Sequence, residues 1–296
     1  MLNLVILKWV STKRSSYQQF VYFYQMAILK RIFDLYLQGS VHVALSAYSL
    51  IRVTEMLLNL VPNPFISGFG FFGTIVGYNF IKYDALARSG SPHRSLRLKL
   101  FIAISVVASL GCAYCFFRLN TITQAVSAVV FLVTALYTLP FFPNRQNARS
   151  WAGLKIYMVA VCWVGVTVVL PVLDAEAPMN SDFYLVCVKR FILIVVLLFI
   201  FEIIDLAWDD PHLKTVPQQI GVRHSKQLGL LLLLVFLLLE LFQRHQRYFA
   251  VSVLVIAMTA IFLLLANERR SKYFTSFWVE SIPIFWLAAI LFLERI

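Results

Sequence analysis

The fold class of this chain is decided by the stretch FYLVCVKRFILIVVLLFIFEIIDLAWDD, residues 183–210. Between Arg190 and Glu202 every residue is apolar, and neither Gly nor Pro occurs anywhere in the stretch. With its flanking residues this run makes a segment of 22 residues, 183–204, which is long enough to cross the hydrocarbon layer of a membrane as an α-helix. Because the apolar residues surround the helix instead of following one stripe, the run predicts a helix in contact with lipid and other apolar helices.

The rest of the chain has the same character. Of 296 residues, 60% are hydrophobic and 14% charged, and the mean hydropathy is +0.80. A water-soluble fold has too small an interior to bury this much apolar surface. Because backbone groups in a bilayer must be hydrogen-bonded within the protein, runs of this length favour helices over a β-barrel. The sequence therefore predicts an all-α, polytopic membrane helical bundle of about nine transmembrane helices, near 41–61, 64–81, 98–117, 122–142, 153–173, 183–204, 228–243, 248–266 and 274–293.

Basic residues indicate the orientation of these helices. The net charge is +12, but Lys and Arg lie between apolar runs and not in a basic domain, so membrane topology explains them better than nucleic-acid binding. When loops are assigned to alternate sides, most basic residues share the side of the N-terminus, and the other side carries Arg118, Arg244, Arg247 and Arg295. The positive-inside rule then predicts a multi-pass protein of the cytoplasmic (inner) membrane with a cytoplasmic N-terminus.

Acidic side chains follow the decisive apolar run directly. Asp205 and Asp209 are four residues apart, which places them about 40° apart around a helix, with Glu202 one turn earlier on the same side. Like charges at this spacing repel unless a cation lies between them, and Mg²⁺ commonly takes one or two carboxylates together with water and phosphate oxygens. The alternative is an ordinary solvated helix end. The position beside hydrocarbon favours the metal site.

The residues that follow this apolar run, 205–221, resemble the second motif of the UbiA superfamily of intramembrane prenyltransferases. The superfamily has nine spanning helices and two aspartate motifs, after the second and the sixth helix. Its second motif matches Asp205-Leu-Ala-Trp-Asp209, followed here by Lys214-Thr215-Val216-Pro217 and then by Gly221. Motif, downstream turn and helix pattern therefore coincide.

The first motif departs from the superfamily pattern, which is Asn-Asp-x-x-Asp. Here Asn79 is followed by Phe80, and Tyr83 holds the later Asp position, with Asp84 one residue beyond. Asp84 lies about 140° around a continuous helix from Asn79, so the two reach one ion only where the helix unwinds. Lys82 adds a positive charge where the superfamily places metal ligands. We therefore expect the first site to be weaker than the second.

The resemblance implies Mg²⁺-dependent transfer of a prenyl group from an allylic isoprenoid diphosphate to an aromatic or other lipophilic acceptor within the membrane lipid. It implies a single UbiA-like domain over residues 41–296, preceded by an interfacial or cytoplasmic segment at 1–40. Asp205 and Asp209 would be the catalytic residues. The implied metal ligands are Asp205, Asp209, Asn79 and Asp84, and the implied diphosphate contacts are Lys214, Arg88 and Lys82.

Two other functions stay open at this point. The degenerate first motif allows a catalytically impaired relative that binds an isoprenoid or quinone-like lipid. Intramembrane charges allow a small transporter, although the inverted repeat that would support it is not found in the sequence. Of these charges, Arg52 and Glu55 are three residues apart and are expected to pair, whereas Lys189 and Arg190 are expected to extend toward the outer membrane surface without a functional role.

Overall fold

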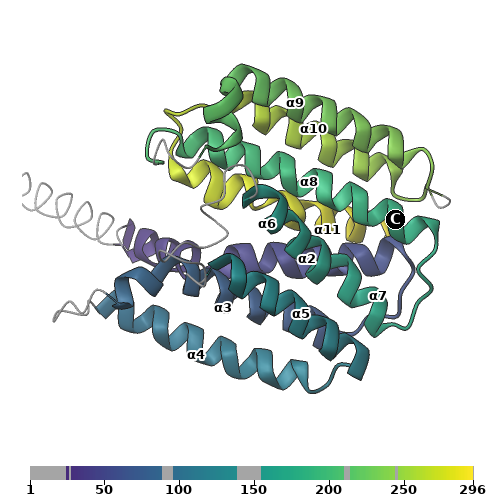
Figure 1. Ribbon diagram of the computed structural model, residues 1–296, viewed down its shortest axis with the longest axis horizontal. Helices are drawn as coiled ribbons and strands as arrows, with labels where there is room; N and C mark the ends of the chain where they lie inside the picture. Colours follow the sequence, from purple (N-terminus) through teal and green to yellow (C-terminus); the bar gives the residue numbers. More distant parts are fainter. Residues whose placement is uncertain are drawn as a thin grey trace, which may run out of the picture.

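The computed structural model describes residues 25–26, 28–88, 96–138, 155–209, 214–243 and 246–295. These residues form helices and connecting turns, with no strand among them, and the helices run up and down in a bundle (Figure 1). Most of the segment expected at 1–40 lies outside the described residues. The helices are α2 (Val41–Leu57), α3 (Pro64–Arg88), α4 (Leu96–Phe116), α5 (Thr121–Thr138), α6 (Lys155–Val164), the π-helix η3 (Gly165–Val169), α7 (Leu170–Asp174), α8 (Ser181–Asp205), α9 (Val216–Glu240), α10 (Phe249–Leu265), the π-helix η5 (Phe274–Val279) and α11 (Ile282–Leu293).

These elements correspond to the predicted segments one by one. Because α6, η3 and α7 are continuous and η5 leads into α11, the described helices from α2 onward form nine helical segments. Six of these segments are long and apolar enough to span a membrane, and Thr121–Leu132 and Phe249–Leu265 are shorter apolar helices. The prediction of an all-helical, multi-pass membrane bundle is confirmed.

One boundary prediction is wrong. The seventh segment was expected to begin at residue 228, but α9 begins at Val216. Its first turns contain Gln218, Gln219 and Arg223, which lower the mean hydropathy of any window that includes them. A helix needs only a cap and a compatible backbone, and Thr215 provides the N-cap.

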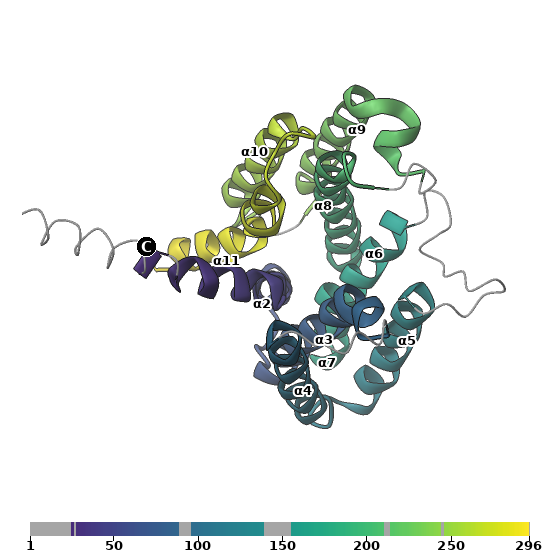
Figure 2. The ribbon, with the colours of Figure 1, turned by 90° about the vertical axis from the view of Figure 1, so that its left-hand side faces the viewer.

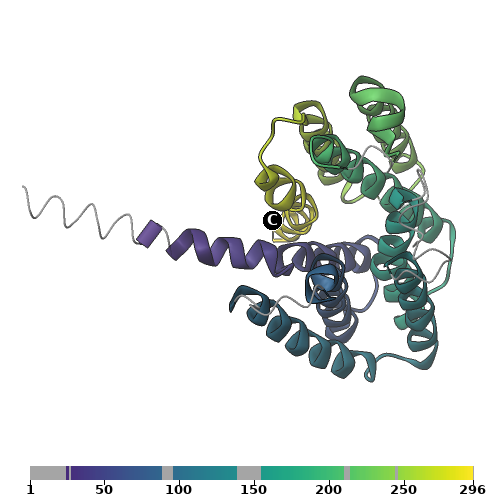
Figure 3. The same ribbon diagram turned by 60° about the vertical axis from the view of Figure 1, so that its left-hand side comes forward.

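The bundle has two distinct ends. At the end that we call the aspartate end, α3, α8 and α10 finish while α2, α4, α6, α9 and η5 begin; it faces left in Figure 1 and toward the viewer in Figure 2. Figure 2 shows α3, α4 and α5 on one side of α2 and α8 to α11 on the other, with α6 between α8 and α3. Residues 28–38 form a helix that precedes α2 and extends outward at this end (Figure 3).

Burial follows the position of each helix in the bundle. The decisive run forms α8, whose Leu193, Val196 and Ile200 are fully buried among neighbouring helices. Outer helices instead expose large apolar side chains, such as Phe131 on α5 and Ile261 on α10. In a membrane these outward side chains contact lipid, so exposure carries no hydrophobic penalty there.

Candidate metal and diphosphate site

The last turn of α8 brings Asp205 and Asp209 together. The Asp209 backbone N–H donates to the Asp205 carbonyl oxygen at 2.9 Å, so the chain completes one more helical turn after α8 ends. Both side chains are half-buried, and Asp209 acts electrostatically on the Asp205 carboxylate. Residues four apart on such a turn share one face. Their role as metal ligands stays a prediction.

The chemistry of this pair fits Mg²⁺. Among the residues that the structure describes, neither carboxylate has an ion-pair or hydrogen-bond partner. Adjacent unpaired carboxylates repel each other, and a cation between them removes the repulsion. No group of three or more His, Cys, Asp or Glu side chains forms a metal cluster within the described ranges. Two carboxylates nevertheless match what Mg²⁺ usually takes from a protein when phosphate oxygens and water complete its shell.

Glu202 has a different role from the two aspartates. Its buried carboxylate accepts a hydrogen bond from the Val216 backbone N–H at 3.2 Å, which joins the end of α8 to the start of α9. The Thr215 backbone N–H donates to Gln218 Oε1 at 3.0 Å, which fixes the first turn of α9. The start of α9 is therefore joined to the last turn of α8.

Gly221 lets α9 change direction just after this turn. Its φ of 79° and ψ of 157° are not helical and are rarely adopted by residues with a Cβ atom. Lys214, on the other side of the turn, has a φ of 47° and an exposed side chain, and its carbonyl oxygen accepts a hydrogen bond from Gln219 Nε2. Its predicted contact with diphosphate is not tested by these contacts.

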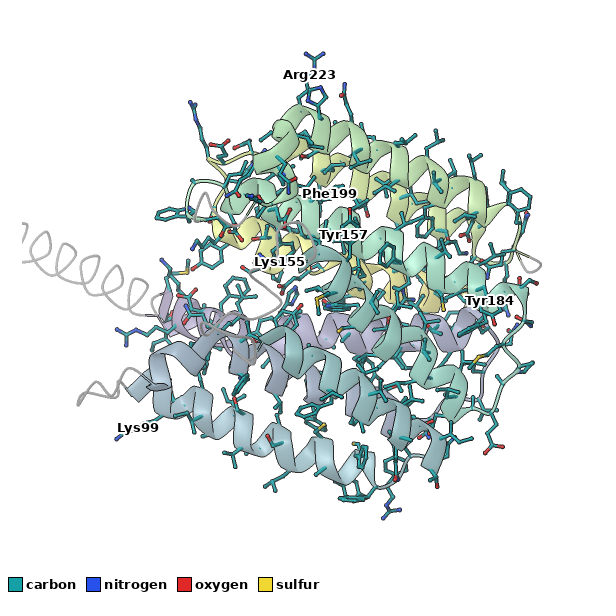
Figure 4. The ribbon with its side chains drawn as sticks, in the orientation of Figure 1. Lys99, Lys155, Tyr157, Tyr184, Phe199 and Arg223 are labelled. Carbon is teal, nitrogen blue, oxygen red and sulfur yellow. The ribbon has the colours of Figure 1, made fainter. Side chains whose placement is uncertain are left out.

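Two lysines that sequence reasoning missed lie next to the aspartates. Lys155 begins α6, which packs along α8, and its ammonium acts electrostatically on Glu202 and Asp205 (Figure 4 shows Lys155 at the start of α6). Lys272 precedes η5, lies over the exposed Trp208 ring at 5.2 Å from its centroid, and also acts on Asp205. In the sequence both residues were only part of the charge count, because nothing local indicates that their loops face the end of α8.

The polar side chains of the first loop are held within the protein. Asn79 is buried, and its Nδ2 donates to Ser105 Oγ on α4 at 3.0 Å. The Tyr83 ring stacks on Phe101 with 4.6 Å between centroids. Asp84 and Arg88 lie on the last turns of α3, but their side chains are outside the described residues.

Lys82 differs from these residues because its side chain is exposed. Its Nζ donates to Ser40 Oγ at 3.0 Å and lies 6.0 Å from the centroid of the Tyr78 ring. Tyr78 in turn accepts a hydrogen bond from Trp163 Nε1 at 3.3 Å, which connects α3 to α6. Glu280, between η5 and α11, also acts electrostatically on Lys82. The ammonium therefore lies at the aspartate end, between elements that are far apart in the sequence.

Arg190 overturns one expectation from the sequence. It does not extend toward the membrane surface: the side chain is 1% exposed and points into the bundle. Its Nη1 donates to Thr167 Oγ1 at 2.7 Å, and its Nη2 donates to Thr54 Oγ1 at 3.1 Å. The guanidinium lies 5.7 Å from the centroid of the Trp286 ring. Hydropathy could not show this, because the acceptors come from α2 and η3.

Lys189 is also buried, contrary to expectation. Its Nζ is 2.7 Å from Glu240 Oε2 on α9 and donates to Gln243 Oε1 as well. The predicted pair between Arg52 and Glu55 is confirmed, with Nη1 and Oε2 2.5 Å apart. Arg190, Lys189 and Glu55 therefore each bond inside the bundle to a partner charge or to neutral acceptors.

Comparisons with known proteins identify the fold. Neither a protein-family model nor a curated protein matches this sequence. A UbiA homolog from Archaeoglobus fulgidus matches with a TM-score of 0.61 at 15% identity, covering 88% of this chain and 100% of that chain. A structure of a UbiA homolog from the same organism bound to GPP and Mg²⁺ matches with a TM-score of 0.60 at 14% identity. This match covers 88% of this chain and 100% of that chain. The apo structure of a UbiA homolog from Aeropyrum pernix K1 matches with a TM-score of 0.60 at 14% identity, covering 86% of this chain and 99% of that chain. The chain therefore has the membrane fold of the UbiA homologs.

Proposed function

We propose that this protein transfers a prenyl group from an allylic isoprenoid diphosphate to an aromatic or other lipophilic acceptor in the membrane, with Mg²⁺ as cofactor. One observation carries the proposal: within a UbiA-type fold, α8 ends in two adjacent carboxylates, Asp205 and Asp209, that have no described partner. A matching fold whose solved structure contains GPP and Mg²⁺ supports the same ligands here.

Each residue of the site has a defined task in this proposal. Asp205 and Asp209 would hold Mg²⁺, whose charge would offset the negative charge that develops on the diphosphate as the allylic C–O bond breaks. Lys155 and Lys272 add positive charge beside the carboxylates and favour the bound and the departing diphosphate. Lys214 and Arg88 remain proposed contacts from the flanking loops. Asn79 and Asp84 remain the proposed weaker metal ligands.

The surroundings of the site suit an apolar donor. The prenyl chain needs a water-poor environment next to the charged diphosphate site, and the aspartate end lies directly on an apolar bundle. Tyr78 and Trp163 form a hydrogen-bonded aromatic pair beside Lys82. Aromatic faces stabilise a nearby cation, including the allylic cation that remains after diphosphate leaves.

The test is release of pyrophosphate from geranyl diphosphate by the full chain in lipid nanodiscs, with Mg²⁺ or with EDTA. We expect release with Mg²⁺ only, and we expect Asp209→Asn to abolish it. Glu268→Gln is the matched control, because this exposed acid lies between α10 and η5 at the same end of the bundle. Equal activity of Asp209→Asn and Glu268→Gln would contradict the site assignment.

The structure offers one specific reason for a second candidate, a relative that binds the diphosphate without turnover. The first loop has Asn79 bonded to Ser105 and an ammonium at Lys82, so these two described side chains are not arranged as metal ligands. Binding of geranyl diphosphate that requires Mg²⁺, without pyrophosphate release in the presence of any acceptor, would favour this candidate over the enzyme.

A further inference from the structure

We infer that the helix preceding α2, residues 28–38, lies on the phospholipid surface at the aspartate end. Its exposed apolar side chains, Ile28, Leu29 and Ile32, contact lipid, and its two basic residues lie beside the phosphate headgroups. The sequence alone left this segment as either interfacial or cytoplasmic. The inference goes beyond the proposed function and does not depend on it, because it concerns a surface of the protein and not the candidate metal site.

The helix has an apolar face and a charged face. At 100° per residue, Ile28, Leu29 and Ile32 lie within one arc of about 100°, and Lys30 and Arg31 lie in the opposite half of the helix. Leu29 is 61% exposed and Ile32 is 59% exposed, although both side chains are large and apolar. An exposed apolar face with basic residues on the polar side is typical of a helix in a membrane interface.

A different face of this helix is already packed on the bundle. The ring of Phe33 lies 5.2 Å from the ring of Phe277 in η5, measured between centroids, and Leu37, one turn later, is buried. Around the helix axis Phe33 and Leu37 point about 100° and 140° away from Ile32. The apolar face is therefore not the face that the bundle covers.

The turn between this helix and α2 fixes the direction of the helix. Ser40 has a φ of 62°, in the left-handed region, which separates the helix from α2. Lys82 Nζ donates to Ser40 Oγ and the Tyr83 hydroxyl donates to the Gln38 carbonyl oxygen, both at 3.0 Å, so the end of α3 holds the turn. Figure 2, which faces the aspartate end, shows the purple helix from the side. The helix therefore crosses the end of the bundle at an angle, as expected of a helix on the membrane surface.

The charges favour phospholipid as the partner of the apolar face. Asp34 is the only acid among residues 28–38, and its Oδ1 accepts a hydrogen bond from the Tyr273 hydroxyl at 2.5 Å. Lys30 and Arg31 are exposed, so the helix presents positive charge next to its apolar face. Phosphate headgroups lie directly above acyl chains and complement both faces. A second copy of the chain would bring the same positive charge to the contact and would be repelled.

The apolar face is tested by photocrosslinking with p-benzoylphenylalanine in place of Ile32, in the otherwise unchanged chain in phospholipid vesicles. Mass spectrometry should find a phospholipid adduct at this position. The same label at Phe131, which is exposed on α5, is the positive control, and at Gln38, exposed on the charged face, it should give little adduct. A crosslinked dimer would assign the face to a second copy, and absence of any adduct would place it in water. Either result would overturn the inference.

The basic residues are tested by combining Lys30→Gln and Arg31→Gln in the labelled chain. At low salt the unchanged helix should give more adduct in vesicles that contain phosphatidylglycerol than in pure phosphatidylcholine, because an anionic surface attracts each basic residue. The double variant should lose this difference. Lys99→Gln, at an exposed position on α4 at the same end, is the control and should keep it (Figure 4). Equal adduct in both lipids before substitution would overturn the assignment of Lys30 and Arg31 to the headgroups.

Discussion

Arg190 on α8 donates a 2.7 Å hydrogen bond to Thr167 Oγ1 in the π-helical turn η3. The same guanidinium donates to the Leu50 carbonyl oxygen and to Thr54 Oγ1 on α2, so one side chain connects three helical segments. π-helical turns are less favourable than α-helical ones and persist where tertiary contacts hold them. The cation is thus held by neutral acceptors on α2, more than a hundred residues away in sequence, and on η3, 23 residues away.

This arrangement predicts a large effect of Arg190→Ala on stability. The change removes three hydrogen bonds and leaves a void among packed helices, so we expect a loss of about 3 kcal/mol or more. Arg190→Met should cost less, since it fills most of the volume and removes a buried charge. Thermal unfolding in detergent measures both. Arg223→Ala, on the exposed side of α9 (Figure 4), is the control, and equal stability of Arg190→Ala and Arg223→Ala would contradict the prediction.

Lys155→Met should weaken binding of geranyl diphosphate in the presence of Mg²⁺. Lys155 is the half-buried first residue of α6 and acts electrostatically on Asp205, so loss of its charge-assisted hydrogen bond to the diphosphate should reduce the affinity about tenfold. Lys272 is exposed, and Lys272→Met should have a smaller, few-fold effect that added salt reduces further. Isothermal titration measures the affinity of wild type, of both variants and of the control Lys99→Met. Lys99 is exposed on α4 at the same end of the bundle (Figure 4). A larger effect at Lys272 than at Lys155 would be inconsistent with this geometry.

Gly221→Ala should destabilise the start of α9. A Cβ atom at this position meets no atom within 4 Å, so the cost comes from the backbone conformation alone and should be about 1–3 kcal/mol. Gly77 offers a matched comparison, because a Cβ atom there also meets nothing within 4 Å but the residue lies inside α3. Gly77→Ala should stabilise by about 0.5–1 kcal/mol. Denaturation of the two variants in parallel would refute the argument if both changes had the same sign.

The proposed orientation is tested by labelling single introduced cysteines with a membrane-impermeant maleimide. Glu268→Cys lies at the aspartate end and should react only from the cytoplasmic side. Glu176→Cys lies between α7 and α8 at the opposite end and should react only from the other side. Both positions are exposed, so neither should disturb the fold. If the two labels exchange sides, the positive-inside assignment fails, while the antiparallel bundle is unaffected.

Features that depend on local sequence could be predicted, and features that depend on distant partners could not. Residues 183–204 predict α8 because every residue there is compatible with a buried helix. The juxtaposition of Asp205 and Asp209 is equally local, since four residues of helical spacing suffice. Hydropathy did not indicate where α9 begins, because its first turns depend on the Thr215 cap and on the backbone conformation of Gly221.

The environment of the site is the part that sequence could not supply. Lys155 and Lys272 act on Asp205 only because α6 and η5 pack near the end of α8. In the sequence they are separated from Asp205 by tens of residues and resemble any basic loop residue. Arg190 was misplaced for the same reason, because its acceptors lie on α2 and η3.

The buried pair of Lys189 on α8 and Glu240 on α9 has a consequence for biogenesis. A basic residue within a spanning segment costs up to about 2.5–3.5 kcal/mol, the value for the helix centre, when that segment enters the bilayer from the translocon. Lys189 finds its acid only on the following helix, 2.7 Å away in the finished protein. Insertion of α8 and α9 as a helical hairpin would bring the two charges together during entry, whereas insertion of α8 alone would expose Lys189 to lipid until its partner helix is synthesised.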